Sequence, residues 1–165
     1  KFKEGGSDGK LIESGYSFDD PGSGNLERLA ADLVKLKRGE DTLIPVYHMD
    51  GTGVSIPDGL LIQPKKIIAV DSIFALNPEV KNELDIKVFV HKDPDELKKG
   101  WYARANSRNN TTPEENDRLY ADVIAKGKKF IEPGKKIADV IVNGSAPKDD
   151  VINMYKEISE LLSRN

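Results

Sequence analysis

The stretch Ile67-Ile68-Ala69-Val70-Asp71 decides the fold that this sequence predicts. Four apolar residues end in a carboxylate, and a continuous apolar run of this length is typical of a strand buried on both faces of a parallel sheet. Ligands of open α/β sheets bind outside the carboxyl ends of the strands, so we expect Asp71 to meet a ligand or a metal ion. The alternative is that Asp71 caps the turn that follows it.

Two further apolar runs, 86–90 and 139–143, predict parallel strands like the one at 67–71. Capping residues and helical spacing predict helices from about 25 to 39, from 93, from 112, and from 147 to 162. The segment 43–47 reads as an edge strand, because it contains a proline, followed by an exposed hairpin or loop over 48–59 and a returning strand at 60–63. Strands that alternate with helices predict a parallel, layered α/β sheet. We expect a single domain over residues 1–165, with 1–17 as loop.

The composition of the chain, with 38% hydrophobic and 32% charged residues, is that of a globular protein rather than a disordered one. The formal net charge of −3 argues against a general nucleic-acid binder, because phosphate binding normally requires a basic excess. The absence of cysteine excludes disulfides and thiolate metal sites. No apolar run approaches the ~20 residues that cross a bilayer, and we recognise no signal peptide. We therefore expect a cytoplasmic protein without nucleic-acid or membrane partners.

The segment from Gly5 to Lys10 invites comparison with a phosphate-binding P-loop, but the spacing fails. A P-loop requires glycine six residues before its lysine, where this chain has Glu4. It also requires serine or threonine directly after the lysine to hold magnesium, and Leu11 stands there. We therefore expect no P-loop in this segment.

Six segments nevertheless form a recognisable series along the chain. They are Phe18-Asp19-Asp20-Pro21, Pro45-Val46-Tyr47, Ile67 to Ile73, Asp85 to Val90, Phe130-Ile131-Glu132-Pro133, and Lys135 to Ile141. In order and spacing they resemble the uridine kinase and phosphoribulokinase family of P-loop phosphotransferases, the uridine kinase branch most closely. The resemblance covers roughly residues 16–162. It implies a P-loop kinase-like fold, with a parallel sheet layered between helices, in which the first strand and the Walker A loop lie before the region that this chain covers.

The resemblance implies two catalytic residues and a cofactor. In such kinases the aspartate at the place of Asp19 holds the acceptor hydroxyls and can act as the base. The acid at the place of Asp71 lies near Mg2+ and the transferred phosphate, which makes Asp71 the expected metal ligand and ATP with Mg2+ the expected cofactor. Phosphoryl transfer depends on positioning and charge neutralisation, which explains acids at these two places. The alternative for Asp19 is that it only shapes a turn.

The resemblance also implies substrate-binding residues. The tyrosine at the place of Tyr47 lies against the nucleobase, although this residue can equally be ordinary strand packing. Asp20 stands where the family has the histidine of the acceptor turn. Arg104 and Arg108 are the nearest matches to the lid arginines that clamp the phosphates. The family's Glu-Gly at the strand end is Asp71-Ser72 in this chain, which shortens the acid.

Two classes of function follow. The first is the acceptor-and-lid portion of a kinase that phosphorylates a nucleoside or another small hydroxyl acceptor once a P-loop segment completes it. The second is a noncatalytic binding or interaction domain derived from that fold. We expect this chain alone to be inactive, because it contains no P-loop. Since the family's first strand lies between the partners matching 67–71 and 86–90, we expect those two strands to pair directly, or a second copy of the chain or a complementing N-terminal segment to fill the gap.

Overall fold

The computed structural model describes residues 17–47, 55–108 and 112–163, and the chain divides into two compact units. Unit 1 comprises Lys1–Asp85 and unit 2 comprises Ile86–Asn165. The segments expected as loop at 1–16 and 48–54 lie outside the described residues. The single domain expected over 1–165 stays a prediction. The predicted class is confirmed, because the described residues form a mixed α/β structure that includes a parallel sheet.

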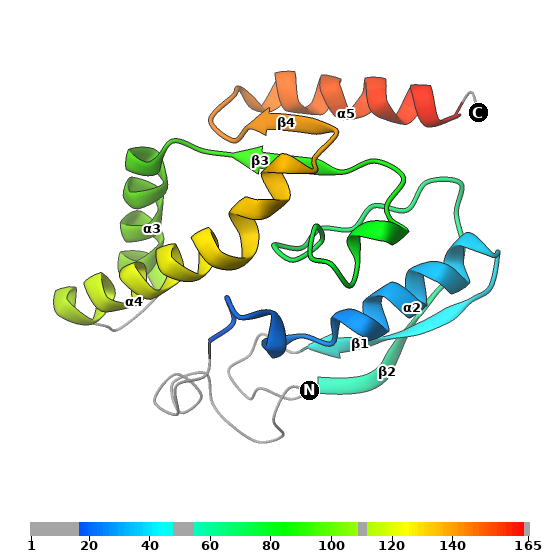
Figure 1. The fold of residues 1–165 in the computed structure, drawn as a ribbon, viewed down its shortest axis with the longest axis horizontal. Helices are drawn as coiled ribbons and strands as arrows, with labels where there is room; N and C mark the ends of the chain where they lie inside the picture. Colours follow the sequence, from blue (N-terminus) through cyan, green and yellow to red (C-terminus); the bar gives the residue numbers. More distant parts are fainter. Residues whose placement is uncertain (1–16, 48–54, 109–111, 164–165) are drawn as a thin grey trace. The chain divides into compact units, whose positions relative to one another are not determined.

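Unit 1 is built around one helix and one hairpin (Figure 1). Its elements are the 3-10 turn η1 (Pro21–Ser23), helix α2 (Leu26–Lys37), strands β1 (Thr42–Tyr47) and β2 (Ser55–Ile62), and the 3-10 turn η2 (Lys81–Glu83). Its buried apolar side chains come from α2, as Leu33 and Leu36, and from the turns that lead to η2, as Phe74 and Val80.

Helix α2 begins and ends where the sequence predicts. The side chain of Asn25 accepts a hydrogen bond from the N–H of Arg28 at 3.0 Å, which satisfies one of the free donors of the first turn. At the other end Gly39 adopts φ 80°, a left-handed conformation that glycine reaches without a Cβ clash. Its N–H donates to the carbonyl of Leu36, and that of Glu40 to the carbonyl of Lys35, which is the Schellman arrangement.

A buried carboxylate joins α2 to the hairpin. Asp32 is 6% exposed, and its Oδ1 accepts a hydrogen bond from the Thr42 hydroxyl, also buried, at 2.6 Å. Its Oδ2 lies 3.6 Å from Nε of Arg28, one turn earlier in the helix. Because a carboxylate out of water must be paired or hydrogen-bonded, these two contacts tie the first residue of β1 to the middle of α2.

The β1–β2 hairpin is antiparallel, and its second strand is longer than predicted. Strand β2 begins at Ser55, so part of the segment expected as an exposed hairpin or loop belongs to the sheet. The ladder shifts register between Ile44, which pairs with Leu60, and Val46, which pairs with Ile56. One residue of β1 therefore faces three of β2, and both sides of this bulge contain a proline, which donates no ladder hydrogen bond.

The prediction of a strand at 67–71 is wrong. These residues have no regular secondary structure, they pair with neither neighbouring strand in the described part of the chain, and Ile67 and Ile68 are exposed. The expected direct pairing of 67–71 with 86–90 is therefore absent as well. A strand is stable only where its N–H and C=O groups find a partner, and an apolar run does not reveal whether such a partner exists.

In its described residues, unit 2 contains the parallel sheet, three α-helices and two short helical turns. Its elements are β3 (Val88–His91), α3 (Pro94–Arg108), α4 (Pro113–Lys126), the π-helical turn η3 (Gly127–Ile131), the 3-10 turn η4 (Glu132–Lys136), β4 (Val140–Asn143) and α5 (Lys148–Ser163). The predicted start of α4 is confirmed by a capping box between Thr112 and Glu115, and α5 follows the predicted terminal helix closely.

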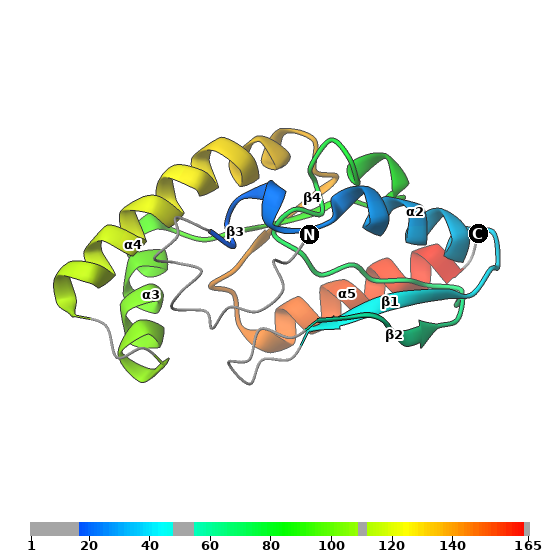
Figure 2. The same ribbon diagram turned by 90° about the horizontal axis from the view of Figure 1, so that it is seen from below.

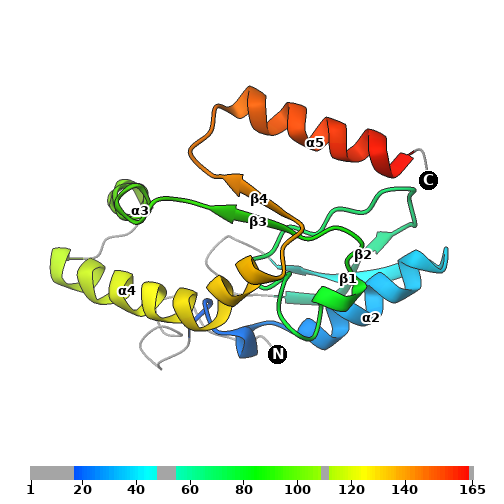
Figure 3. The same cartoon turned by 45° about the horizontal axis from the view of Figure 1, so that its top comes forward.

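Strands β3 and β4 lie side by side and parallel, as predicted for 86–90 and 139–143 (Figure 3). Their register pairs Val88 with Val140 and continues to His91 with Asn143. Just before this ladder, the carboxylate of Asp139 accepts a hydrogen bond from the N–H of Lys87 at 2.8 Å, and the N–H of Asp139 donates to the carbonyl of the same residue. Asp139 therefore fixes the register at the entrance of the sheet.

The buried contact between Asp32 and Thr42 yields a stability prediction. Thr42→Val removes the hydroxyl while keeping the shape of the side chain, so the carboxylate loses a donor that water cannot replace. We expect the free energy of unfolding, measured by urea denaturation, to fall by about 1–3 kcal/mol.

Thr42→Ser is the matched control, because it keeps the hydroxyl and removes only a methyl group. It should be clearly less destabilising than Thr42→Val. Equal losses in the two variants would show that the hydrogen bond to Asp32 contributes nothing.

Candidate active site

The turn that precedes α2 carries the first two predicted site residues. Asp20 caps η1, because its Oδ1 accepts a hydrogen bond from the N–H of Gly22 at 2.9 Å. The N–H of Asp19 donates to the Ser17 hydroxyl at 3.3 Å, and the Ser23 hydroxyl donates to the carbonyl of Phe18 at 3.2 Å. These bonds within the turn fix the backbone at Asp19 directly before α2, with its side chain half-buried. The assignment of Asp19 and Asp20 to an acceptor site stays a prediction.

The hairpin positions the backbone of Tyr47, which is the last residue of β1 and pairs with Ser55. The side chain of Tyr47 lies outside what the structure describes, so its predicted contact with a nucleobase stays a prediction. Between α2 and the hairpin lies a cavity of about 520 Å³. Charged side chains of both signs dominate its lining, among them Arg28, Asp32 and Asp58.

Asp71, the predicted metal ligand, lies on exposed irregular backbone rather than at the end of a strand. The hydroxyl of Ser72, next to it, accepts a hydrogen bond from the N–H of Phe74 at 3.1 Å and so orders the following turn. Among the described residues no group of three or more His, Asp or Glu side chains could hold a metal ion. One carboxylate still fits Mg2+ in a kinase, because this ion keeps several waters and binds substrate phosphates as well.

The two predicted phosphate-binding arginines lie in unit 2. The guanidinium of Arg104 is exposed and stands over the ring of Trp101, 5.5 Å from its centroid. A planar guanidinium of this kind stacks on an aromatic face through a cation–π interaction. Arg108 is the last residue of α3, and its side chain lies outside what the structure describes.

Helices α3 and α4 lie side by side (Figure 2). An aromatic cluster, which the sequence did not reveal, joins them. The ring of Tyr120 lies 6.0 Å from that of Trp101 and 5.8 Å from that of Tyr102, centroid to centroid. The Tyr102 hydroxyl donates a hydrogen bond to the carboxylate of Asp117. This hydrogen bond is the main cause that raises the pKa of Tyr102 above 10.0, and burial and the negative charge of Asp117 add to it. Trp101 of α3 thus packs against Tyr120 of α4.

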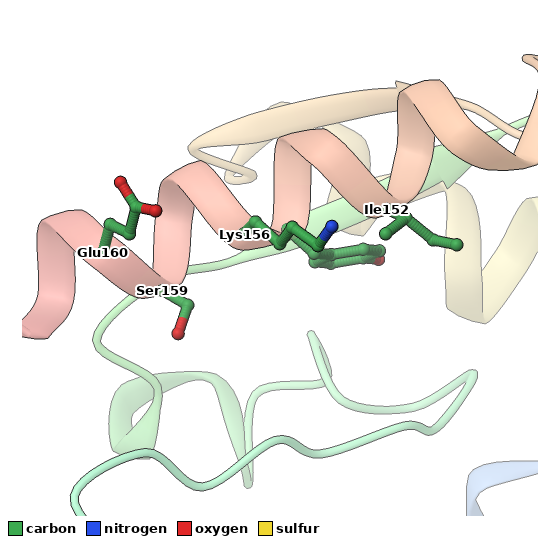
Figure 4. A pocket seen from close by; sticks show the side chains of 5 residues that line it. Ile152, Lys156, Ser159 and Glu160 are labelled. Carbon is green, nitrogen blue, oxygen red and sulfur yellow. The ribbon is translucent and has the colours of Figure 1, made fainter.

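A second hollow, of about 420 Å³, lies on α5 (Figure 4). It is lined by Ile152, Tyr155, Lys156, Ser159 and Glu160. All five come from a single helix, so the hollow is a stretch of helix surface rather than an enclosed site, and we assign it no ligand.

Comparison with known proteins decides the family. The Phosphoribulokinase / Uridine kinase family matches residues 8–151, a span that includes the turn at Phe18–Pro21, the β1–β2 hairpin, helices α3 and α4, and strand β4. The chain belongs to this family. The helices of the described residues include none long and apolar enough to cross a membrane.

Individual relatives agree with the family match. The chain is 28% identical over 142 residues to a uridine kinase of Chlamydia pneumoniae, covering 85% of this chain and 64% of the relative. It is 33% identical over 136 residues to a uridine kinase of Shewanella frigidimarina, covering 76% of this chain and 60% of the relative. A uridine kinase-like protein 5 of Arabidopsis thaliana is 28% identical over 148 residues, which are 84% of this chain and 30% of that protein. The chain thus spans less than two thirds of the first two relatives.

The contact between Tyr102 and Asp117 predicts a pH dependence. A raised pKa means that the folded state holds the phenol proton more tightly than the unfolded chain does. The stability that this contact contributes is therefore fully present below the ordinary pKa of 10.0 and is lost as the pH rises through the higher pKa of the folded state. Among the five tyrosines, we expect one to ionise late when tyrosinate absorbance is followed against pH.

Variants assign that late component. Tyr102→Phe should abolish it, and Asp117→Asn should shift it back toward lower pH, because the acceptor charge is gone. Tyr155→Phe, on α5, is the control and should leave the late component in place. A titration in which Tyr102→Phe removes only an early component would contradict the contact.

Proposed function

We propose that this chain forms the acceptor-binding and lid portion of an ATP-dependent phosphotransferase whose acceptor is a nucleoside or a related small molecule with a hydroxyl group. The proposal includes completion of the site by a P-loop segment, which residues 5–10 do not supply by their spacing. The observation that supports it is the family match over residues 8–151, a span that contains the turn at Asp19 and the β1–β2 hairpin, together with the similarity to known uridine kinases.

The proposed roles follow from residue chemistry and local structure. Asp19, held next to the N-terminus of α2, binds the acceptor hydroxyl and accepts its proton. Asp20 fixes the turn through Gly22 and borders the acceptor. Tyr47, at the end of β1, lies against the base. Stacking of an aromatic ring on a base is tolerant of base identity, which agrees with a nucleoside acceptor without selecting one.

The remaining roles concern charge. ATP with Mg2+, when bound, supplies the phosphoryl group and neutralises charge that develops on it. Asp71 is the residue that would contribute a carboxylate to the metal, and Arg104 and Arg108 would neutralise phosphate oxygens. Arginine is suited to this because its planar fork matches two phosphate oxygens at once.

The test is phosphate transfer from ATP to a panel of nucleosides, in the presence of Mg2+, by the protein as its gene encodes it. Asp19→Asn keeps the size of the side chain and removes its basicity, so kcat should fall by about 100- to 10,000-fold. Asp71→Asn should raise the Mg2+ concentration required for half-maximal rate. Asp149→Asn, which removes an exposed carboxylate from the first turn of α5, is the matched control and should leave both quantities unchanged.

The 165 residues alone provide the second arm of this test. They should show background turnover, because positional and electrostatic contributions of a phosphate cradle supply most of the rate in phosphoryl transfer, at about 1.4 kcal/mol for each factor of ten. Turnover by these residues alone that Asp71→Asn abolishes would refute the need for a P-loop segment. Absence of transfer to every acceptor by the protein as encoded would favour the noncatalytic binding domain.

A further inference from the structure

Arg28 contacts both strands of the hairpin from its place in the first turns of α2. Its Nη2 donates one hydrogen bond to the carbonyl of Leu43 in β1 and another to Oδ1 of Asp58 in β2, each at 2.6 Å. Its Nε lies 3.6 Å from the buried carboxylate of Asp32. One guanidinium therefore joins three segments of unit 1, and we call this set of contacts the Arg28 clasp.

The Arg28 clasp contacts the hairpin at the point where the hydrogen-bond ladder between β1 and β2 is interrupted. Asp58 belongs to the bulge, opposite Pro45, where regular pairing is interrupted. Gly59 follows it in a crowded position, because a Cβ there would lie 3.1 Å from Cγ2 of Val46 and 3.1 Å from Cγ2 of Ile56. The pairs beyond the bulge include Tyr47 with Ser55. The position of the Tyr47 backbone relative to α2 thus depends on the geometry of the bulge.

The same arginine is also anchored next to the acceptor turn. The N–H of Arg28 donates to Oδ1 of Asn25, the residue that caps α2. Only η1 and Gly24 separate this cap from Asp20. The backbone of Arg28 therefore belongs to the segment that carries Asp19, whereas its side chain holds the segment that carries Tyr47.

We propose that Arg28 is a positioning residue for the acceptor: the clasp fixes the β1–β2 hairpin to α2 and so sets the spacing between the acceptor turn at Asp19 and the base-binding end of the hairpin at Tyr47. This inference rests on the proposed function, since it assigns both ends to the acceptor. Arg28 itself touches neither the phosphates nor the reacting atoms in this scheme.

The chemistry of the clasp requires arginine. The hydrogen bond that Arg28 donates to the Asp58 carboxylate is the main cause that raises the pKa of Arg28, so the guanidinium is charged throughout the accessible pH range. The guanidinium reaches two acceptors through Nη2 and faces Asp32 through Nε, a planar arrangement that a lysine ammonium cannot reproduce. The Arg28 clasp thus combines a positive charge with hydrogen bonds in fixed directions.

Steady-state kinetics of the protein as its gene encodes it tests this role. In Arg28→Met, the KM for the nucleoside should rise about tenfold, which corresponds to the loss of roughly one charged hydrogen bond, while kcat and the KM for ATP stay within about twofold. Arg28→Lys should restore part of the loss. The matched control is Arg38→Met at the end of the same helix, whose guanidinium has no partner among the described residues, and it should leave all three constants unchanged.

A merely structural role would give a different pattern. General destabilisation reduces the fraction of folded enzyme and lowers kcat without changing the KM for the acceptor. Amide hydrogen exchange provides the second readout: Arg28→Met should accelerate exchange in β1 and β2 and leave β3 and β4 unchanged, a local effect that global unfolding would not produce.

The outcomes separate this inference from the proposed function. A raised nucleoside KM together with faster exchange confined to the hairpin supports it. If the unmodified protein phosphorylates a nucleoside and Arg28→Met has the same KM for that nucleoside, the proposed role of Arg28 is overturned and the proposed function is not. Absence of phosphorylation by the unmodified protein would overturn the proposed function and this inference with it.

Discussion

A buried carboxylate is the constraint on which unit 1 depends. Asp32 lies on the inward side of α2 between Leu29 and Leu36, where an unpaired charge would cost several kcal/mol. The hydroxyl of Thr42 and the guanidinium of Arg28 pair with this carboxylate. Both partners also connect it to β1, because Thr42 belongs to that strand and Arg28 donates to the carbonyl of Leu43. Hydrogen bonds and an ion pair therefore join the helix to the hairpin. Such contacts restrict the relative orientation of the two elements more narrowly than apolar packing does.

Local signals in the sequence predicted the helices well. Asn25 before α2, Thr112 with Glu115 before α4, and Gly39 after α2 each satisfy a free backbone group through a short-range contact, and such contacts are encoded within a few residues. Sheet structure is different, because a strand requires a distant partner. The runs at 86–90 and 139–143 contain strands that pair with each other. The run at 67–71 has equal apolar character but pairs with no strand in the described residues.

The candidate site divides along the same line. The turn at Asp19 and Asp20 could be predicted from the sequence, because the hydrogen bonds of these two residues join positions two or three apart. The Arg28 clasp could not be predicted from the sequence, because Arg28 and Asp58 lie thirty positions apart. The bulge that places Asp58 next to Arg28 arises only when β1 and β2 pair. The spacing of Arg28 and Asp32, one helical turn apart within a leucine-rich face, was the one available sequence signal.

Asp139 provides a polar contact that aligns β3 with β4, and the apolar run at 67–71 has no such contact among the described residues. Its carboxylate and its N–H both bond to the backbone of Lys87, so the register of β3 and β4 is fixed before the first apolar pair forms. A hydrophobic pattern specifies register strongly only where one face of the strand is buried. Even with this polar anchor, Val90 and Ile141 are 58% and 52% exposed. The anchor therefore determines which residues pair, and burial of the paired strands is a separate requirement that two strands cannot meet by themselves.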